Sequence, residues 1–260
     1  MRYALVAGQR EEARPKLEGV CSNCREPVIA KCGARRVWHW AHLGERTCDV
    51  WWEPETHWHR GWKAHFPNTW QEVIHHAPDG EKHVADVKIP HGLFIEFQHS
   101  FLEPQERLSR EAFYRNMVWV VDGTRRKRDR KRFFSAIALW QRLTRDVFIT
   151  PLVKEGLPTE WLNSSVRVYF DFGTGNEPDD PFPTVAPVVW CLVPQRAMGN
   201  AIIVAVAKDS FVRACRTGEA LFDDGKLVDA VTAHIRRKQF AAYAAYVAYK
   251  KRSRRHIRRF

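Results

Sequence analysis

Two acidic residues and one amide interrupt a pair of otherwise apolar segments. The stretch ADVKIPHGLFIEFQHS, residues 85–100, contains Asp86, Glu96 and Gln98 in the pattern D-x9-E-x-Q. Glu96 and Gln98 share one face of a strand because side chains alternate with a period of two, and a hairpin can bring Asp86 beside them. Two hard oxygen ligands at one place suit Mg²⁺ or Mn²⁺. The pattern therefore predicts a divalent-cation site at Asp86 and Glu96.

A structural explanation of the same two carboxylates needs no metal. A buried carboxylate must be paired, hydrated or bound to a cation, because an isolated charge in the interior is costly. In this alternative Asp86 caps a turn, and Glu96 pairs with Arg107 or Arg110. It does not explain why Gln98 lies on the same strand face.

A second polar set precedes these strands in EPETHWHRGWKAHF, residues 53–66. Aromatic residues recur there at every fourth position and predict the buried face of a helix. An acid, an imidazole and an amine follow at the same spacing beside that face. Taken by itself, such a row is typical of an exposed helix face on which side chains four positions apart stabilise the helix. Its members are Glu55, His59 and Lys63.

The first 50 residues are rich in cysteine, and CSNC is followed by HWAH and a later cysteine. The two-residue spacing in CSNC lets both thiolates reach one ion from a tight turn. A segment this short has little apolar core, so a bound metal would account for its stability. More than four candidate ligands are present. The predicted zinc ligands are Cys21, Cys24, His42 and Cys48, with His39 as the substitute for Cys48.

The elements that must position these residues follow from periodicity and turn signals. Residues 70–76, 82–89 and 93–98 are expected strands, 103–117 a helix and 118–123 a buried strand. The order helix, three strands, helix, strand predicts a mixed α/β layer domain, and the return to a strand after a crossover helix predicts parallel pairing.

The second half of the chain contains less chemistry. We expect helices at 133–143 and 226–250, with strands at 166–172, 188–194 and 201–207 between them. Cys191 and Cys215 are expected core residues. Tyr243, Tyr246 and Tyr249 are spaced for one edge of the last helix, where packing is expected. The predicted parts are a zinc-binding module at 1–50, an α/β core at 51–143, and a C-terminal α/β accessory region with a long helix and a basic tail at 144–260.

The basicity of the chain is local. The net charge is +12, and two runs, RRKRDRKR at 125–132 and KKRSRRHIRRF at 250–260, carry seven Lys or Arg each. Such runs neutralise phosphates, and no strongly amphipathic helix with an aromatic face adjoins them, so we expect nucleic acid rather than a membrane as partner. The expected contacts are Arg125, Arg126, Lys127, Arg128, Lys250, Lys251, Arg252, Arg254 and Arg255.

Composition sets the class of protein. With 260 residues and 45% hydrophobic residues the chain can fill a real core. Apolar runs such as AIIVAVA at 201–207 are too short to cross a bilayer, and no signal segment opens the chain, so a cytoplasmic protein is expected. Six cysteines without such a signal argue against a disulfide framework.

Together, the quoted motifs resemble the competence protein CoiA-like nuclease family of the PD-(D/E)xK superfamily. The resemblance rests on CSNC with HWAH, on the row from Glu55 to Lys63, on residues 85–100, and on RLSREAFYRNMVWVVDG behind them. It covers about residues 14–123. It implies a restriction-endonuclease-like core at 51–143. One departure is Gln98, which stands where lysine is usual.

The resemblance also implies roles for individual residues. Asp86 and Glu96, helped by the Phe97 carbonyl, would hold Mg²⁺ or Mn²⁺. Glu55 resembles the helical acid that completes such sites. The positive charge that Gln98 does not supply would come from Lys63 or from Lys88. His59 or Lys63 could orient the phosphate or the nucleophile. Arg110 and Tyr114 match a flanking helix, where substrate contact and packing are equally plausible.

The expected function is therefore metal-dependent hydrolysis of DNA, in uptake, recombination or defence. The alternative is a catalytically inactive nucleic-acid-binding module of a larger DNA-processing assembly. Basic runs do not separate DNA from RNA, so RNA is not excluded. The completeness of the set Glu55, Asp86, Glu96 and Gln98 favours the enzyme.

Overall fold

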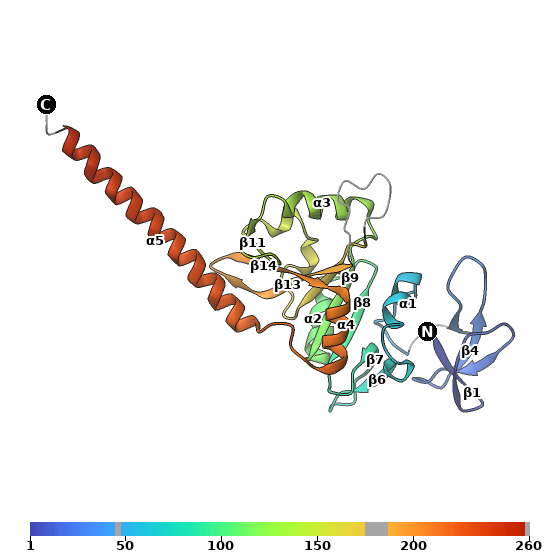
Figure 1. Ribbon diagram of the computed structural model, residues 1–260. Coiled ribbons are helices and arrows are strands. Elements are labelled where there is room, and N and C mark those ends of the chain that lie inside the picture. Colours follow the sequence, from blue (N-terminus) through green and yellow to red (C-terminus); the bar gives the residue numbers. More distant parts are fainter. Residues whose placement is uncertain (45–47, 175–186, 258–260) are drawn as a thin grey trace.

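The computed structural model describes residues 1–44, 48–174 and 187–257, with side chains described as far as residue 251 (Figure 1). The N-terminal residues form a five-stranded antiparallel sheet in the order β2-β1-β3-β4-β5. Its core is small and is centred on Ala4, Val28 and the fully buried Trp40. The strands are β1 (Tyr3–Val6), β2 (Gln9–Glu12), β3 (Glu18–Val20), β4 (Pro27–Lys31) and β5 (His39–His42).

The rest of the chain is built on one nine-stranded mixed sheet. Its order is β10-β11-β14-β13-β12-β9-β8-β7-β6. Only the pairs β8–β9 and β9–β12 are parallel, and the other neighbours are antiparallel. The strands are β6 (Gln71–His76), β7 (Lys82–Lys88), β8 (Phe94–Gln98), β9 (Met117–Asp122), β10 (Gln141–Arg142), β11 (Val147–Thr150), β12 (Val168–Asp171), β13 (Val188–Ala197) and β14 (Asn200–Ala207).

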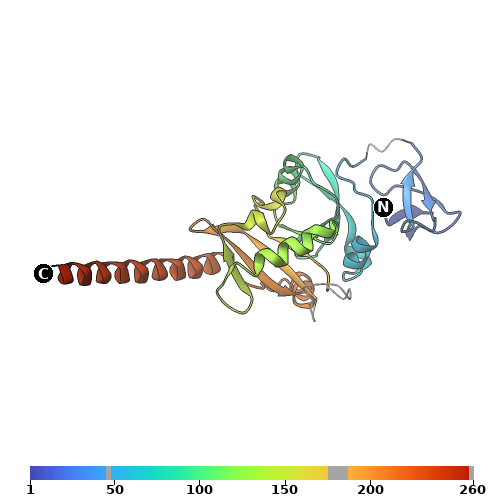
Figure 2. The same ribbon diagram turned by 90° about the horizontal axis from the view of Figure 1, so that it is seen from above.

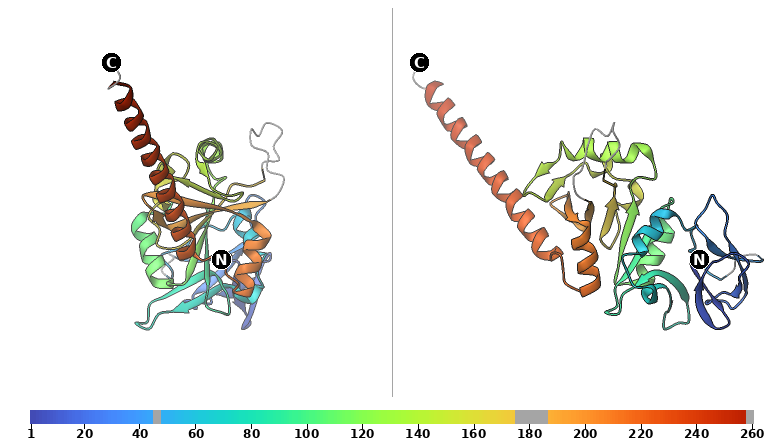
Figure 3. Two further views of the ribbon diagram at one scale, coloured as in Figure 1. Left: turned by 60° about the vertical axis from the view of Figure 1, so that its left-hand side comes forward. Right: turned by 45° about the vertical axis from the view of Figure 1, so that its right-hand side comes forward.

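Helices cover both faces of this sheet (Figure 3). Trp62 of α1, Phe211 of α4 and Val231 of α5 join one apolar cluster, whereas Tyr114 of α2 and Phe133 of α3 join the other. Neighbouring residues of β9 alternate between the two clusters, as the strand period requires. The helices are α1 (His57–Lys63), α2 (Pro104–Tyr114), α3 (Lys127–Ile137), α4 (Lys208–Thr217) and α5 (Asp224–Ile257), with 3-10 turns at Asn68–Trp70, Val153–Glu155 and Thr159–Trp161.

Several expectations are confirmed. The predicted strands from residue 70 to 98 correspond to β6, β7 and β8, and α2 returns the chain to β9, which pairs parallel with β8. Cys191 and Cys215 are buried in the core. The chain is thus a mixed α/β protein with two sheets.

The helix expected at 133–143 is displaced toward the N-terminus. It begins at Lys127 and ends at Ile137, so most of the basic run at 125–132 is helical. Lysine and arginine are good helix formers, and their charges stay outside while Phe133 and Phe134 face the core. Trp140 packs in the same apolar cluster, beyond the end of the helix.

The boundary expected between residues 143 and 144 does not separate two sheets. Strand β12 from the C-terminal half pairs with β9 from the first half, in register Val168↔Trp119 to Asp171↔Asp122. Strands β11, β12, β13 and β14 therefore continue the sheet on which the expected core at 51–143 is built.

Helix α5 leaves the body of the protein and extends away from it on the side opposite the N-terminal sheet (Figures 1 and 2). Tyr243, Tyr246 and Tyr249 are 66%, 55% and 67% exposed, so the expectation that they pack is wrong. In the described part of the chain, none of the helices combines the length and apolar character needed to span a membrane.

Candidate functional site

Strands β7 and β8 separate at the point where the two predicted metal ligands occur. Their antiparallel ladder contains Lys88↔Phe94 and Val87↔Ile95 and then stops. Beyond it, the Asp86 N–H donates to Glu96 Oε1 at 3.1 Å, and the Phe97 N–H donates to Asp86 Oδ2 at 2.9 Å. Each carboxylate accepts a hydrogen bond from the opposite strand. The backbone therefore fixes Asp86 and Glu96 side by side, as the sequence predicted.

Lys63 supplies the cation nearest to this pair. Its Nζ lies 2.8 Å from Asp86 Oδ1, 3.5 Å from Glu72 Oε1 and 3.7 Å from Glu55 Oε1. The side chain is 5% exposed. Burial opposes its charge, but the surrounding carboxylates, Asp86 first, hold the Lys63 pKa above its ordinary value. Lys88, the other candidate, instead contacts His75 Nδ1 at 3.4 Å.

Glu96 is a buried acid of the site. It is 4% exposed and lies 3.3 Å from Arg110 Nη1. Burial and the Asp86 carboxylate raise the Glu96 pKa to about 8, and Arg110 offsets only part of this effect. The ion pair with Arg110 is the one that the metal-free explanation of the sequence anticipated.

The first turn of α1 positions His59. Thr56 is the N-cap, and its N–H and hydroxyl lie 3.3 Å and 2.9 Å from His59 Nδ1 in a capping box. His59 Nε2 lies 3.1 Å from the Phe97 carbonyl oxygen and 3.4 Å from Glu53 Oε1. Both ring nitrogens are thus engaged within the chain. Glu55 precedes the cap, so it is not on the helix with the other members of its expected row.

Glu53 is a site residue that the sequence reasoning missed. Its Oε1 accepts the N–H groups of His99 and Ser100, and its Oε2 accepts the Gln98 amide at 2.5 Å and the Ser100 hydroxyl at 2.7 Å. Burial opposes ionisation, but His59 and Ser100 hold the Glu53 pKa below its ordinary value. Glu53 therefore holds the Gln98 side chain at the end of β8, and this neutral amide does not supply the charge of the usual lysine.

Glu72 is the second residue that was missed. It accepts the N–H groups of Arg2 at 2.7 Å and Tyr3 at 3.2 Å, and so ties the N-terminal sheet to β6 beside Lys63. Burial opposes its charge, but Lys63 and the N-terminal ammonium group lower the Glu72 pKa to about 2. Its φ of 46° places it in the left-handed region, a strained conformation for a residue with a side chain.

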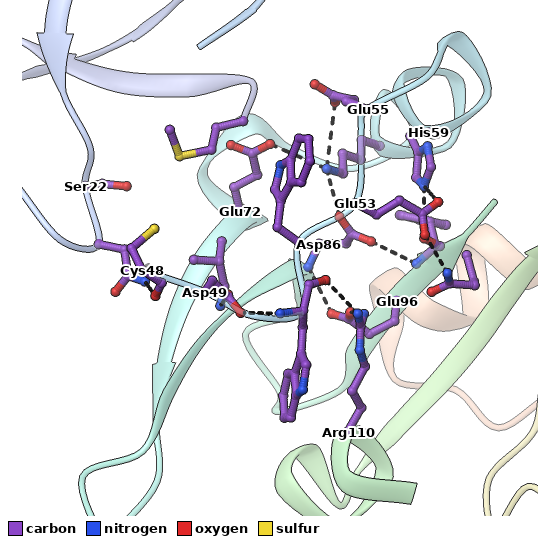
Figure 4. Close-up of a pocket in the computed structure, with 18 of the residues that line it drawn as sticks. Ser22, Cys48, Asp49, Glu53, Glu55, His59, Glu72, Asp86, Glu96 and Arg110 are labelled. Carbon is purple, nitrogen blue, oxygen red and sulfur yellow. Dashed lines mark hydrogen bonds and ion pairs between the residues drawn. The ribbon is translucent and has the colours of Figure 1, made fainter. Parts of the chain in front are cut away.

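These groups line one cavity of about 80 Å³, which has room for several water molecules. Residues of the N-terminal sheet and residues of the nine-stranded sheet both contribute to its wall (Figure 4). The acidic side chains outnumber the lysine and arginine side chains, so the cavity favours a cation. The acidic residues are Asp49, Glu53, Glu55, Glu72, Asp86 and Glu96, and the basic ones are Lys63 and Arg110.

The predicted zinc ligands form a cluster at the edge of the N-terminal sheet. The ligand atoms of Cys21, Cys24, His42 and Cys48 lie within 4.8 Å of one another. Cys24 Sγ is 3.2 Å from His42 Nε2, and Cys21 Sγ is 4.0 Å from Cys48 Sγ. Tetrahedral zinc with bonds of about 2.3 Å to sulfur separates its sulfur ligands by about 3.8 Å. The cluster therefore suits a structural metal ion such as zinc.

Local backbone geometry explains why these four residues converge. A tight turn, closed by the Arg25 N–H to the Cys21 carbonyl at 3.0 Å, brings Cys21 and Cys24 together, and Arg25 adopts a φ of 67°. Burial and the neighbouring Cys21 and Cys24 sulfurs raise the Cys48 thiol pKa to about 12. Ionised thiolates in this cluster therefore need a cation.

His39, the substitute ligand, is outside the cluster. It and His42 belong to β5, where side chains alternate, so His42 shares the face of the buried Trp40 while His39 points the other way. The His39 ring contacts the Val37 carbonyl oxygen at 2.9 Å.

The predicted nucleic-acid contacts differ in exposure. Arg110 and Tyr114 are 6% and 3% exposed, so packing describes both of them. Of the predicted contacts at 125–128, Arg125 is partly buried, whereas the other three are exposed. Arg252, Arg254 and Arg255 lie beyond the described side chains. The exposed candidates are Arg126, Lys127, Arg128, Lys250 and Lys251.

Residues 9–51 match the family model of the competence protein CoiA, N-terminal domain. The N-terminal module is CoiA-like. The match covers all four clustered ligands from Cys21 to Cys48 and Asp49 of the pocket, and it ends before the other pocket acids, Glu53, Glu55, Glu72, Asp86 and Glu96. The resemblance to CoiA-like proteins is thereby confirmed for this module. No curated protein and no solved structure gives a significant match to the chain.

Proposed function

We propose that this chain is a metal-dependent nuclease that hydrolyses DNA in a competence-related process. The observation that carries the proposal is the pairing of Asp86 and Glu96 where β7 and β8 separate, with the ammonium of Lys63 at 2.8 Å from Asp86. Adjacent carboxylates and one lysine, held by backbone hydrogen bonds in a cavity, are the groups that phosphodiester hydrolysis needs.

The donor chemistry of the pair fits a divalent cation. Asp86 and Glu96 offer hard oxygen atoms, and the Phe97 carbonyl belongs to the residue that follows Glu96 in β8. A cation held there would polarise a phosphate oxygen and lower the pKa of a bound water. The excess of acidic side chains in the cavity supports this assignment.

Lys63 would do the work of the lysine that Gln98 replaces. Its ammonium points from α1 to Asp86 and would stabilise negative charge that develops on the phosphoryl group. Gln98 would keep the end of β8 in place through Glu53. His59 would fix the direction of the Phe97 carbonyl.

Two observations favour DNA as the partner and competence as the setting. The CoiA-like module takes its name from a competence protein. Arg126, Lys127 and Arg128 at the start of α3 are exposed and form a surface suited to phosphates. We place this protein in the cytoplasm, where such DNA is processed.

The second candidate is a nucleic-acid-binding module without catalysis. It is favoured by the ion pairs themselves, because Asp86 already has Lys63 as its partner and Glu96 has Arg110. Among the described residues, the Cys and His cluster is also the only group of three or more Cys, His, Asp or Glu ligands close enough to share one metal ion.

The test is cleavage of single-stranded and double-stranded DNA, linear and circular, by the purified protein with no added metal, with Mg²⁺ and with Mn²⁺. Comparing reactions with and without added metal avoids the use of a chelator, which would also remove a metal ion from the Cys and His cluster. We expect cleavage that requires the added metal and falls at least about 1000-fold in Asp86→Asn and Glu96→Gln.

Asp224→Asn is the matched control, because Asp224 is a paired carboxylate outside the pocket, 3.0 Å from Arg167 Nε. It should cleave like the unaltered protein. DNA binding without cleavage under every metal condition would reject the nuclease proposal and favour the nucleic-acid-binding module. Full activity in both pocket variants would also reject the proposed site.

A further inference from the structure

The outer half of α5 is an apolar helical segment whose large side chains are mostly exposed. Leu227, Val231 and Ile235 pack against the large sheet, but residues 239–249 contain no charged residue and lie on the part of the helix that extends from the body (Figures 1 and 3). Phe240 is 74% exposed. A helix that is apolar on all sides is normally covered. This segment therefore has the composition of a binding surface.

Cations bracket the uncharged segment on both sides. Arg236, Arg237 and Lys238 precede it, and Lys250 and Lys251 follow it. The last acidic residue of the chain is Asp229, and ten Lys or Arg residues come after it. Residues 237 and 251 are separated by about 21 Å along an α-helix. A partner that covers residues 239–249 must therefore carry negative charge beside both groups of cations.

This charge pattern disfavours a second copy of the helix as the partner. In an antiparallel pair centred on the apolar segment, Lys238 of one copy would face Lys251 of the other. In a parallel pair every cation would face its own counterpart. Both arrangements place like charges opposite each other without any acidic residue to compensate, which is destabilising.

The exposed aromatic rings add stacking to the electrostatic attraction of the cations. Tyr243 and Tyr246 are exposed over more than half of their surface, and Lys250 Nζ lies 5.6 Å from the centre of the Tyr246 ring. Exposed rings between clusters of cations are the elements with which proteins hold single strands, since unpaired bases stack on the rings while phosphates meet the cations. Duplex bases are already stacked and cannot use them.

We propose that residues 236–251 of α5 bind single-stranded nucleic acid. The phosphates contact the two basic clusters, and the bases stack on Phe240, Tyr243 and Tyr246. The inference rests on the proposed function only in its choice of nucleic acid as the polyanion. It assigns the nuclease a single-stranded substrate or product at a place distant from the pocket.

The experiment measures binding of the full chain to fluorescent oligo(dT), to a hairpin duplex and to a heparin fragment of similar charge, without added Mg²⁺ or Mn²⁺. The first variant is Phe240→Ala, Tyr243→Ala and Tyr246→Ala combined. It keeps every charge, and alanine is a better helix former than the residues it replaces. The second variant is Arg236→Gln, Arg237→Gln and Lys238→Gln combined.

We expect the aromatic variant to bind oligo(dT) about 10- to 100-fold more weakly, with an unchanged salt slope and with unchanged binding to heparin and duplex. The basic variant should weaken binding to all three and reduce the salt slope. Equal effects of the aromatic variant on heparin and oligo(dT), or no effect on either, would overturn the proposal.

Two other occupants would be revealed by the same proteins. Self-association of the unaltered chain that the aromatic variant abolishes would assign the segment to a second copy. Binding to anionic phosphatidylserine vesicles with no binding to oligo(dT) would assign it to a lipid surface. Because neither Asp86 nor Glu96 is altered and no cleavage is measured, failure of this proposal is distinct from failure of the nuclease.

Discussion

Lys63 Nζ lies 2.8 Å from Asp86 Oδ1, and this contact links α1 to β7 within the pocket. The ammonium also lies within 4 Å of Glu55 and Glu72, so it neutralises several acids at the place where we propose a divalent cation. Lysine and metal then share one set of carboxylates. The strength of metal binding depends on how far the lysine can move.

Lys63→Met tests this competition. Removing one partner of a buried ion pair costs about 3–5 kcal/mol, so the variant should be less stable than the unaltered protein when no Mg²⁺ is present. Mg²⁺ or Mn²⁺ should then raise its thermal midpoint by more than it raises that of the unaltered protein. Lys88→Met, which alters the lysine beside His75, is the control and should respond like the unaltered protein. Equal metal shifts in all three proteins would argue against a shared site.

Lowering the pH should weaken the attachment of the N-terminal module to β6, because Glu72 becomes protonated. Its folded pKa of about 2 is below the ordinary value of 4.5, so its contribution to stability is complete above pH 4.5 and is lost as the pH falls toward 2. The protection of the Arg2 and Tyr3 amides, which donate to Glu72, should fall in that range when their hydrogen exchange is compared with the rate of an unfolded amide at the same pH. In Glu72→Gln the same amides should exchange faster already at pH 6. Protection that does not change in the variant would contradict this role.

Zinc content should depend on the four clustered ligands and on no other cysteine or histidine of the module. Cys48→Ser should lose the metal, and the module should lose its fold, because its apolar core consists of few residues around Trp40. Cys32→Ser and His39→Ala, which alter residues outside the cluster, should keep one metal ion per chain. Metal analysis and the fluorescence of the tryptophans would measure both effects. Loss of zinc in His39→Ala would show that the cluster is wrongly assigned.

The exposed start of α3 should contribute to binding of any nucleic acid, whatever its strandedness. Removing a side chain that binds one phosphate should reduce the slope of log affinity against log salt by about 0.7–0.9. We therefore expect Lys127→Gln to lower this slope and Lys154→Gln, which changes an exposed lysine on a 3-10 turn, to leave it unchanged. Identical slopes in both variants would remove α3 from the binding surface.

Local patterns predicted those site residues whose relation is set by short-range geometry. The spacing in CSNC and the alternation along β5 place Cys21, Cys24 and His42 together, and a hairpin aligns Asp86 with Glu96. These relations need only a turn and a strand period. They could therefore be obtained from the sequence without knowledge of the tertiary packing.

Glu53 and Glu72 could not be found in this way. Glu53 meets Ser100 across 47 positions of the chain, and Glu72 meets Arg2 across 70. Neither contact follows from a periodic pattern, because each depends on how one folded part docks on another. The exposed Tyr243 was misjudged for a related reason, since spacing on a helix shows which residues share an edge but not whether anything covers it.

The pairing of β12 with β9 decides how this chain can be divided. A cut after residue 143 would leave β9 with one free edge and would expose the apolar side chains that β12 covers, a situation that promotes aggregation. Any shortened version of the chain therefore has to keep the nine-stranded sheet whole. The CoiA-like module has a separate five-stranded sheet and its own Cys and His cluster, so a cut between the two sheets would divide neither of them.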